Sequence, residues 1–178
     1  TGRIDKLIRE LLDYAAPGSG EAVPVDPVAV LRETVTMLQH QGMFDGVVVD
    51  DRCGQVTAQV LLDSHRLQQV WVNLLLNARD AMDGTGTVHL ATEINGDRFA
   101  VLINDEGPGI TAAQVGKIFE PFYTTKDTGK GRGLGLAVCQ RIIDAAGGRI
   151  EVRSGTSGTI FSVCLPLVGT AHSETRDV

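Results

Sequence analysis

The sequence predicts an α/β (α+β) two-layer sandwich, in which one mixed β-sheet carries helices on one face. Two observations support this fold class. Hydrophobic residues make up 43% of the 178 residues, enough for a core, and the segments of strand and helix character follow one another in mixed order. A doubly wound sheet would need a stricter alternation of strands and helices. Because aromatic residues are only 4% of the chain, we expect a core of Val, Leu, Ile and Ala.

Periodicity and local stop signals define the elements in order. Asp26-Pro27 provides a helix cap and a proline at the first helical position, which predicts a helix over 27–40. The most strongly periodic segment predicts a long helix over 65–82, and Gly147-Gly148 ends a third helix, over 134–146. Strands are expected at 46–51, 55–62, 86–94, 98–104, 149–154 and 158–165.

The chain divides into one main domain with short flanking segments. Residues 1–16 carry an apolar stripe at helical spacing, formed by Ile4, Leu7, Ile8, Leu11 and Leu12. This stripe fits either the last turns of a longer helix that packs against a partner or an ordinary amphipathic helix docked on the domain. We expect a Pro- and Gly-containing linker over 17–25, the main domain over 26–167 and a disordered tail over 168–178.

Charge and cysteine content narrow the function classes. Sixteen basic and 22 acidic residues give a net charge of -6. No overall basic field would attract nucleic acid or an anionic membrane, so an anionic ligand would need a local cluster of cations. Three widely spaced cysteines without a metal-ligand pattern predict reduced thiols in a cytoplasmic protein. Neither a signal peptide nor a long apolar run occurs, so we expect no direct membrane contact by this fragment.

The long predicted helix has an unusual polar side. Gln69, Asn73, Asn77 and Asp80 follow at spacings of four, four and three residues, so they line one face. Asn is a mediocre helix former, and two of them one turn apart suggest a specific role. Their amide oxygens could face a Mg²⁺–phosphate group, because Mg²⁺ prefers oxygen ligands. A solvated helix face is the alternative.

Two glycine-rich loops are candidates for nucleotide contacts. In the segment 105–110, Asp105 stands at a strand end, where its carboxylate could accept a hydrogen bond from an amine such as that of adenine. An ordinary turn is the alternative. In the segment 129–136, four alternating glycines precede a helix and cations lie nearby, which favours a phosphate cradle over a flexible surface loop. The P-loop, Rossmann and protein-kinase patterns are absent.

Five short motifs resemble, in order, the successive boxes of the ATP-binding domain of sensor histidine kinases. They are Asn73–Asn77, Asp105-x-Gly107-x-Gly109, Phe119-Glu120-Pro121-Phe122, Gly131-x-Gly133-x-Gly135 and Gly158-Thr159. That domain belongs to a wider family shared with DNA gyrase, Hsp90 and MutL. The resemblance covers about residues 60–166 and implies a Bergerat fold with a lid over about 120–133. The lid looks most similar to those of nitrogen-regulation and PAS-linked sensors.

The resemblance also assigns roles to residues. Asn77 matches the Mg²⁺ ligand, Asn73 lies one turn earlier near the phosphates, and Lys126 resembles the phosphate cation of the lid; these three are the expected catalytic residues. Asp105 matches the adenine-binding carboxylate, and Thr159 the hydroxyl that supports it. The other expected ATP contacts are Asp80, Gly107, Gly109, Ile110, Phe119, Phe122, Lys130, Gly131, Arg132, Gly133, Leu134 and Gly135.

The implied activity is transfer of the γ-phosphoryl group of ATP to a histidine, for relay to an aspartate of a response regulator receiver domain. Gyrase-type relatives carry a water-activating Glu where Asn73 stands, which argues against an efficient ATPase. The histidines His40, His65, His89 and His172 lack the acceptor context. We therefore expect the acceptor upstream of Thr1, on dimerisation helices that end at residues 1–16 and form a homodimer in the full-length protein.

Under this interpretation the fragment alone would not phosphorylate itself, and the full-length protein could be anchored in a membrane upstream. Two alternatives remain at this point. One is a nucleotide-binding module without transfer activity, and the other is a serine kinase of the anti-sigma-factor type.

Overall fold

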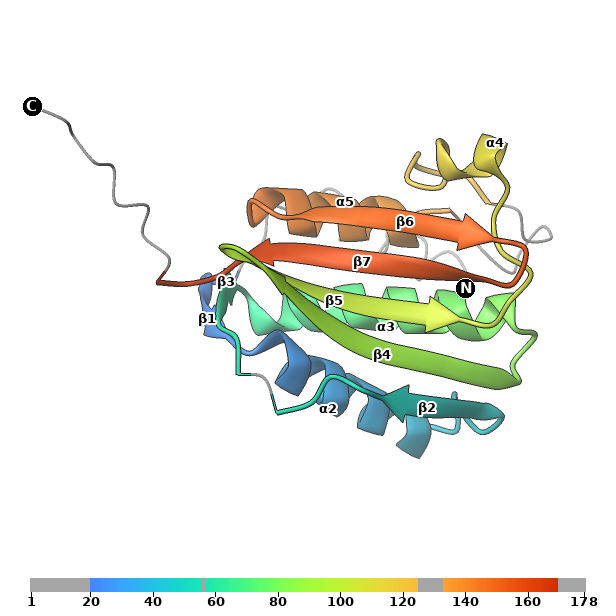
Figure 1. The fold of residues 1–178 in the computed structure, drawn as a ribbon, viewed down its shortest axis with the longest axis horizontal. Helices are drawn as coiled ribbons and strands as arrows, with labels where there is room; N and C mark the ends of the chain where they lie inside the picture. Colours follow the sequence, from blue (N-terminus) through green and yellow to red (C-terminus); the bar gives the residue numbers. More distant parts are fainter. Residues whose placement is uncertain (1–19, 56, 125–132, 170–178) are drawn as a thin grey trace, which may run out of the picture.

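The computed structural model describes residues 20–55, 57–124 and 133–169. Its main sheet has the strand order β2-β4-β5-β7-β6, in which β2 is parallel to β4 and the other neighbours are antiparallel. The long helices pack on one face of this sheet (Figure 1). The predicted two-layer sandwich with one mixed sheet is confirmed. The strands are β2 (Val47–Asp51), β4 (Gly86–Asn95), β5 (Arg98–Asp105), β6 (Arg149–Gly155) and β7 (Gly158–Pro166).

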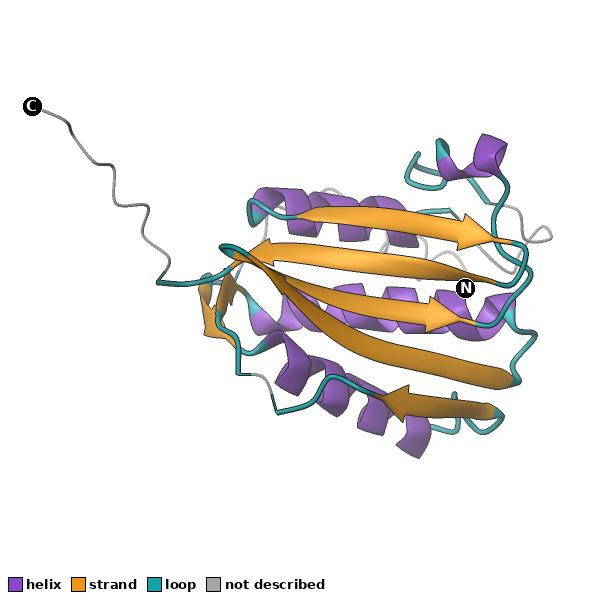
Figure 2. Ribbon diagram, viewed as in Figure 1, coloured by secondary structure: helices purple, strands orange, loops and turns teal. Residues whose placement is uncertain are grey.

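The helices of this layer begin and end close to the predicted positions. They are α2 (Pro27–His40), α3 (Ser64–Ala81) and α5 (Gly135–Ala145); a short α4 (Ala112–Val115) lies apart from them (Figure 2). The Asp26 carboxylate accepts from the backbone N–H of Val28 at 2.9 Å, which caps α2 as expected. Asp63 caps α3 in the same way, by accepting from the N–H of Arg66 at 2.9 Å.

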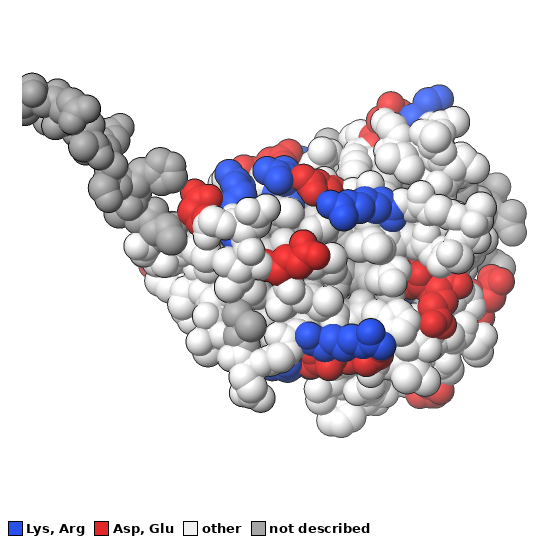
Figure 3. Space-filling view, in the orientation of Figure 1, with Lys and Arg blue, Asp and Glu red and all other residues white. Residues whose placement is uncertain are grey.

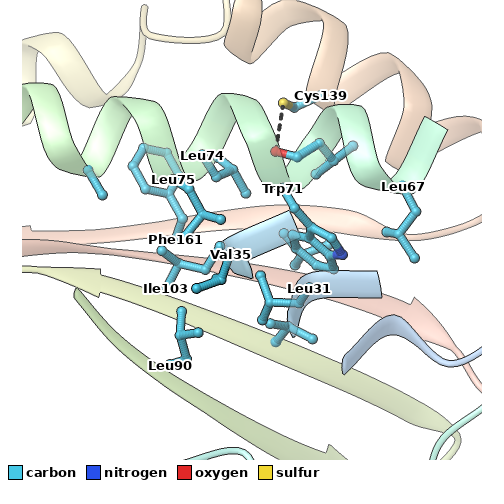
Figure 4. Close-up of a cluster of buried hydrophobic side chains, with 14 of the residues drawn as sticks. Leu31, Val35, Leu67, Trp71, Leu74, Leu75, Leu90, Ile103, Cys139 and Phe161 are labelled. Carbon is cyan, nitrogen blue, oxygen red and sulfur yellow. Dashed lines mark hydrogen bonds between the residues drawn. The ribbon is translucent and has the colours of Figure 1, made fainter. Parts of the chain in front are cut away.

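Helix α3 lies at the centre of the core. Its apolar side chains point onto the sheet, where Leu90, Ile103 and Phe161 meet them (Figure 4). Cys139 of α5 donates from Sγ to the carbonyl of Val70, 3.8 Å away, where α5 packs beside α3. Complete burial of one such large side chain stabilises the fold by about 1.5–3 kcal/mol. The buried apolar side chains of α3 therefore fix the rotation of this helix about its axis, and with it the direction of its polar side.

The structure differs from the prediction around residues 20–62. Among the described residues of the predicted strand 55–62, only Val60–Leu62 forms a strand, β3, which pairs outside the main sheet with β1 (Val23–Val25). Residues 23–25 were expected within a linker. Packing against the rest of the domain explains this difference. Val60 and Leu62 are buried and Leu61 is exposed, so the β1–β3 ribbon covers the edge of the core.

The described residues reach the start of the tail predicted over 168–178. The backbone N–H of Val168 donates to the carbonyl of Gln59 at 2.7 Å, so this residue is part of the folded domain. The predicted helix over 1–16 lies outside the described residues. Within the described ranges, no helix combines the length and apolar character that crossing a bilayer requires. On the face of the sheet that the helices leave open, basic and acidic side chains are interspersed (Figure 3).

Candidate functional site

Asp105 is a buried carboxylate at the end of the central strand β5. Asp105 is only 2% exposed, and one oxygen of its carboxylate accepts a hydrogen bond from the backbone N–H of Gly107 at 2.9 Å. Burial raises the pKa of Asp105, and backbone hydrogen bonds from Gly107 and Thr159 oppose that rise. A buried acceptor of this kind favours a ligand that brings a hydrogen-bond donor.

The two glycines that follow Asp105 lie where no side chain fits. A Cβ on Gly107 would lie 2.9 Å from the carbonyl oxygen of Ala81, at the end of α3. A Cβ on Gly109 would lie 1.8 Å from the carbonyl oxygen of Gly155, and the φ of Gly109 is +81°. The loop is therefore bare backbone pressed between α3 and the β6–β7 turn, which forms a flat wall beside Asp105.

Ser154, which the sequence analysis missed, joins this loop to the neighbouring hairpin. Its Oγ accepts from the N–H of Ile110 at 2.6 Å and lies 3.1 Å from Oγ1 of Thr159. Thr159 is 3% exposed and pairs with Asp105 across the β5–β7 ladder. In the sequence, Ser154 looks like any polar residue before the turn Gly155-Thr156-Ser157-Gly158, so no local signal distinguishes it.

The polar side of α3 meets the start of α5. The side-chain Nδ2 of Asn73 donates to the carbonyl oxygen of Gly135 at 3.3 Å. A Cβ on Gly135 would lie 3.4 Å from Oδ1 of the same Asn73, so the backbone approaches the amide closely. Leu134, just before α5, is buried and anchors this end of the helix. The structure thus brings Asn73 together with Gly135, the last glycine of the second glycine-rich loop.

Asn77 and Asp80 continue the same side of α3 toward the Asp105 loop. Asn77 is half-buried, one helical turn after Asn73. Asp80 accepts from Nε of Arg79 at 2.9 Å, so one of its oxygens already serves an ion pair. Because the helix ends against Gly107, Asn77 lies along α3 between the two glycine-rich loops.

The base of the predicted lid is closed by a backbone contact. Phe122 donates from its N–H to the carbonyl of Gly133 at 2.9 Å. Gly133 has a φ of +68°, and a Cβ there would lie 2.3 Å from the carbonyl oxygen of Tyr123. Phe119 packs partly buried against the core, whereas Phe122 is 61% exposed with a φ of +68°. Residues 125–132, which include Lys126, Lys130, Gly131 and Arg132, lie outside the described residues.

Comparison with known families gives the assignment. Residues 62–169 match the family described as "Histidine kinase-, DNA gyrase B-, and HSP90-like ATPase". This chain belongs to that ATPase family. The match includes both glycine-rich loops and all of α3, so the resemblance to sensor histidine kinase domains is confirmed.

The relatives of this ATPase domain are sensor kinases. The histidine-protein kinase AtoS of Escherichia coli is 34% identical over 166 residues, which cover 92% of this chain and 27% of AtoS. The sensor histidine kinase ZraS of Salmonella typhimurium is 31% identical, over 93% of this chain and 36% of ZraS. The chain therefore spans about a quarter to a third of the length of these relatives.

Solved structures agree with this ATPase fold. The catalytic domain of histidine kinase ThkA, in a nucleotide-free form, superposes with a TM-score of 0.73 at 28% identity, over 83% of this chain and 96% of that one. Full-length ShkA in complex with AMPPNP gives a TM-score of 0.75 at 28% identity, over 91% of this chain and 35% of ShkA. ThkA in complex with the response regulator TrrA gives 0.77 at 25% identity, over 93% and 47%.

Proposed function

We propose that this chain is the catalytic domain of a sensor histidine kinase and binds Mg²⁺–ATP between its two glycine-rich loops. The observation that carries the proposal is Asp105: a buried acceptor beside a wall of backbone that a single Cβ at Gly107 or Gly109 would fill. Membership of the ATPase family and the AMPPNP complex of ShkA support the same ligand.

Asp105 and Thr159 would hold the adenine. The Asp105 oxygen that bonds Gly107 is fixed by that contact, so the carboxylate can present its remaining acceptor positions to the exocyclic amine. Thr159 and Ser154 supply hydroxyl groups at the same edge, and Gly107, Gly109 and Ile110 supply the close backbone surface.

The phosphates would lie between α3 and the N-terminus of α5. Backbone N–H groups at a helix start favour anions, and the close contact between Asn73 and Gly135 fixes that start. Asn77 would offer its amide oxygen to Mg²⁺, which when bound neutralises charge on the phosphate oxygens. Residues around the lid and one acid near the metal complete the proposed site. They are Phe119, Phe122, Gly133 and Leu134, the lid residues Lys126, Lys130, Gly131 and Arg132, and Asp80 near the metal.

In this proposal the γ-phosphoryl group passes to a histidine that lies outside this chain, on the dimerisation helices of a homodimer. A receiver domain would then take the phosphoryl group, and the complex of ThkA with TrrA supports this type of partner. Positioning and charge neutralisation by Asn73, Asn77 and the lid cations would be the contribution of this domain. Such a domain works on cytoplasmic ATP, and the three buried free cysteines fit that compartment.

Titration calorimetry with Mg²⁺ and AMPPNP tests the proposal. We expect binding by the wild type and at least a tenfold weaker affinity for Asn77→Asp and Asp105→Asn. At a ligand concentration of 100 Kd the wild type should also gain about 2.7 kcal/mol in stability. Asn95→Asp, at an exposed hairpin position, is the control and should bind normally. Absence of both heat and thermal stabilisation in the wild type would refute the proposal.

A further inference from the structure

Two carboxylates contact the imidazole ring of His89, which lies on β4 on the face of the sheet that the helices leave open. Nδ1 of His89 is 2.8 Å from Oδ2 of Asp50 on β2, and Nε2 is 3.1 Å from Oε1 of Glu106. Directly across on β5 stands the neutral Asn104. A carboxylate only accepts hydrogen bonds, whereas a neutral imidazole has a single N–H donor. Both contacts are therefore hydrogen bonds only when the ring is protonated on both nitrogens.

The two carboxylates differ in what else they bind. Asp50 also pairs with Arg52, 2.5 Å from the same Oδ2. The other oxygen of Glu106 accepts from the backbone N–H of Thr87 at 3.1 Å. Hydrogen bonds from Arg52 and His89 lower the pKa of Asp50, and the hydrogen bond from His89 lowers the pKa of Glu106. Both carboxylates are therefore charged at neutral pH.

Loss of one proton from His89 breaks the contact with Glu106 before the contact with Asp50. The contact with Asp50 is the shorter one, and the Asp50 side chain is 32% exposed against 53% for Glu106. The one N–H of the neutral ring therefore stays with Asp50. Nε2 then turns an unshared electron pair toward the Glu106 carboxylate and repels it. Because hydrogen bonds to Asp50 and Glu106 raise the pKa of His89, this loss occurs above about pH 6.5.

Glu106 follows Asp105 directly, in the loop that forms the proposed adenine wall. Its carboxylate joins this loop to Thr87 and His89 of β4. Its backbone N–H donates to Sδ of Met82, just after α3, at 3.4 Å. The start of the loop is thus held from β4 and from the end of α3, and the contact through His89 is the one that loss of a proton removes.

We propose that His89 and Glu106 position the loop of Asp105 for the adenine, and that nucleotide binds more tightly when His89 carries both ring protons. Both residues act through the loop and not by touching the nucleotide. This positioning role rests on the proposed function, because it concerns the adenine end of the same site. Coupling between two binding equilibria is reciprocal, so bound nucleotide should in turn raise the pKa of His89.

Calorimetry with Mg²⁺ and AMPPNP at pH 6 and at pH 8.5 tests this role in the 178-residue chain. We expect the ratio of the affinity at pH 6 to that at pH 8.5 to be about threefold larger in the wild type than in His89→Gln, a size typical of one exposed ion pair. Titration of the nucleotide, and of Asp105, whose pKa burial raises, is common to both proteins and cancels in this comparison. His65→Gln, at an exposed position in α3, should keep the wild-type ratio.

Glu106→Gln separates the effect of the proton from a contact that is merely structural. The Gln amide can accept from the N–H of Thr87 and can also donate to Nε2 of a neutral His89, so it should hold the loop at either pH. We expect the affinity ratio of Glu106→Gln to match that of His89→Gln. At pH 8.5 the affinity of Glu106→Gln should at least equal that of the wild type, whereas Glu106→Ala should bind more weakly than the wild type at pH 6.

The outcomes distinguish this role from nucleotide binding itself. An affinity ratio in the wild type equal to that in His89→Gln would overturn the positioning role and leave the proposed function standing. No AMPPNP binding by the wild type at either pH would refute both. The imidazole NMR signals of His89, identified by their loss in His89→Gln, give a second readout: saturating AMPPNP should move their titration midpoint to higher pH, and an unchanged or lower midpoint would contradict the coupling.

Discussion

The amide of Asn73 donates a hydrogen bond to the carbonyl of Gly135, 62 residues later in the chain. This contact uses the nitrogen of the side chain and so fixes which way its oxygen faces. It also holds the first turn of α5 against α3 at the proposed phosphate site. In the proposed site, Asn73 would act on the nucleotide through the position of Gly135 as well as through its own oxygen.

Replacing Asn73 by Asp should weaken nucleotide binding. A carboxylate has no donor for the Gly135 carbonyl and adds negative charge beside the proposed phosphates. We expect at least a tenfold weaker AMPPNP affinity and a loss of about 1–2 kcal/mol in the free energy of unfolding. Calorimetry and urea unfolding measure the two effects. Gln69→Glu, on the same side of α3, is the matched charge control, and equal affinities for both variants would argue against the role given to Asn73.

Loss of the Ser154 hydroxyl should loosen the adenine edge of the site. In Ser154→Ala the N–H of Ile110 loses its acceptor and Thr159 loses a partner. We expect about a fivefold weaker AMPPNP affinity, equivalent to one hydrogen bond of about 1 kcal/mol, with partial recovery in Ser154→Thr. Ser162→Ala, on the open face of the same sheet, should bind normally. If Ser154→Ala bound AMPPNP as tightly as the wild type, the proposed role of the Ser154 hydroxyl in supporting the adenine end of the site would be ruled out.

A pair of glycine variants separates backbone strain from crowding. Gly109 and Gly84 have similar φ angles, +81° and +84°, but only Gly109 has a neighbour where a Cβ would stand. Both Ala variants carry the strain of a left-handed residue, about 1–2 kcal/mol. We expect Gly109→Ala to be destabilised further, by at least about 2 kcal/mol more in urea unfolding, and to lose AMPPNP binding. Similar losses of stability in both variants would mean that crowding at Gly109 is relieved at little cost.

His89 should make stability depend on pH. Hydrogen bonds to Asp50 and Glu106 raise the pKa of His89, and Arg52 pairs with the same Asp50. A raised pKa in the folded state gives stabilisation that is complete below about pH 6.5, the value for an unperturbed histidine, and is lost as pH rises through the folded pKa.

We therefore expect His89→Gln to be destabilised relative to the wild type at pH 6 and less so at pH 8.5. Urea unfolding at the two pH values measures this difference. His65→Gln, at an exposed position in the first turn of α3, serves as the control. A constant difference between the wild type and His89→Gln at both pH values would contradict the prediction.

Local signals explain which parts of the fold were predictable. Helix α2 has its cap, its proline and its apolar stripe within one segment, so its bounds follow from the sequence. The β1–β3 ribbon does not, because three residues become a strand only where a distant segment pairs with them. Within the candidate site, Asp105 and Gly109 stand out by motif. The bond from Asn73 to Gly135 and the bridging by Ser154 join residues far apart, and no spacing in the sequence encodes them.

Asp105 and Thr159 are direct neighbours in the sheet although the lid, α5 and β6 all lie between them in the chain. That whole stretch is an insertion between two adjacent strands. Lengthening the surface loops of this insertion adds little to the entropic cost of bringing its two ends together, because that cost grows only with the logarithm of the length of the insertion. A lid of another length could therefore be inserted here while the strand pair proposed to contact the base keeps its register.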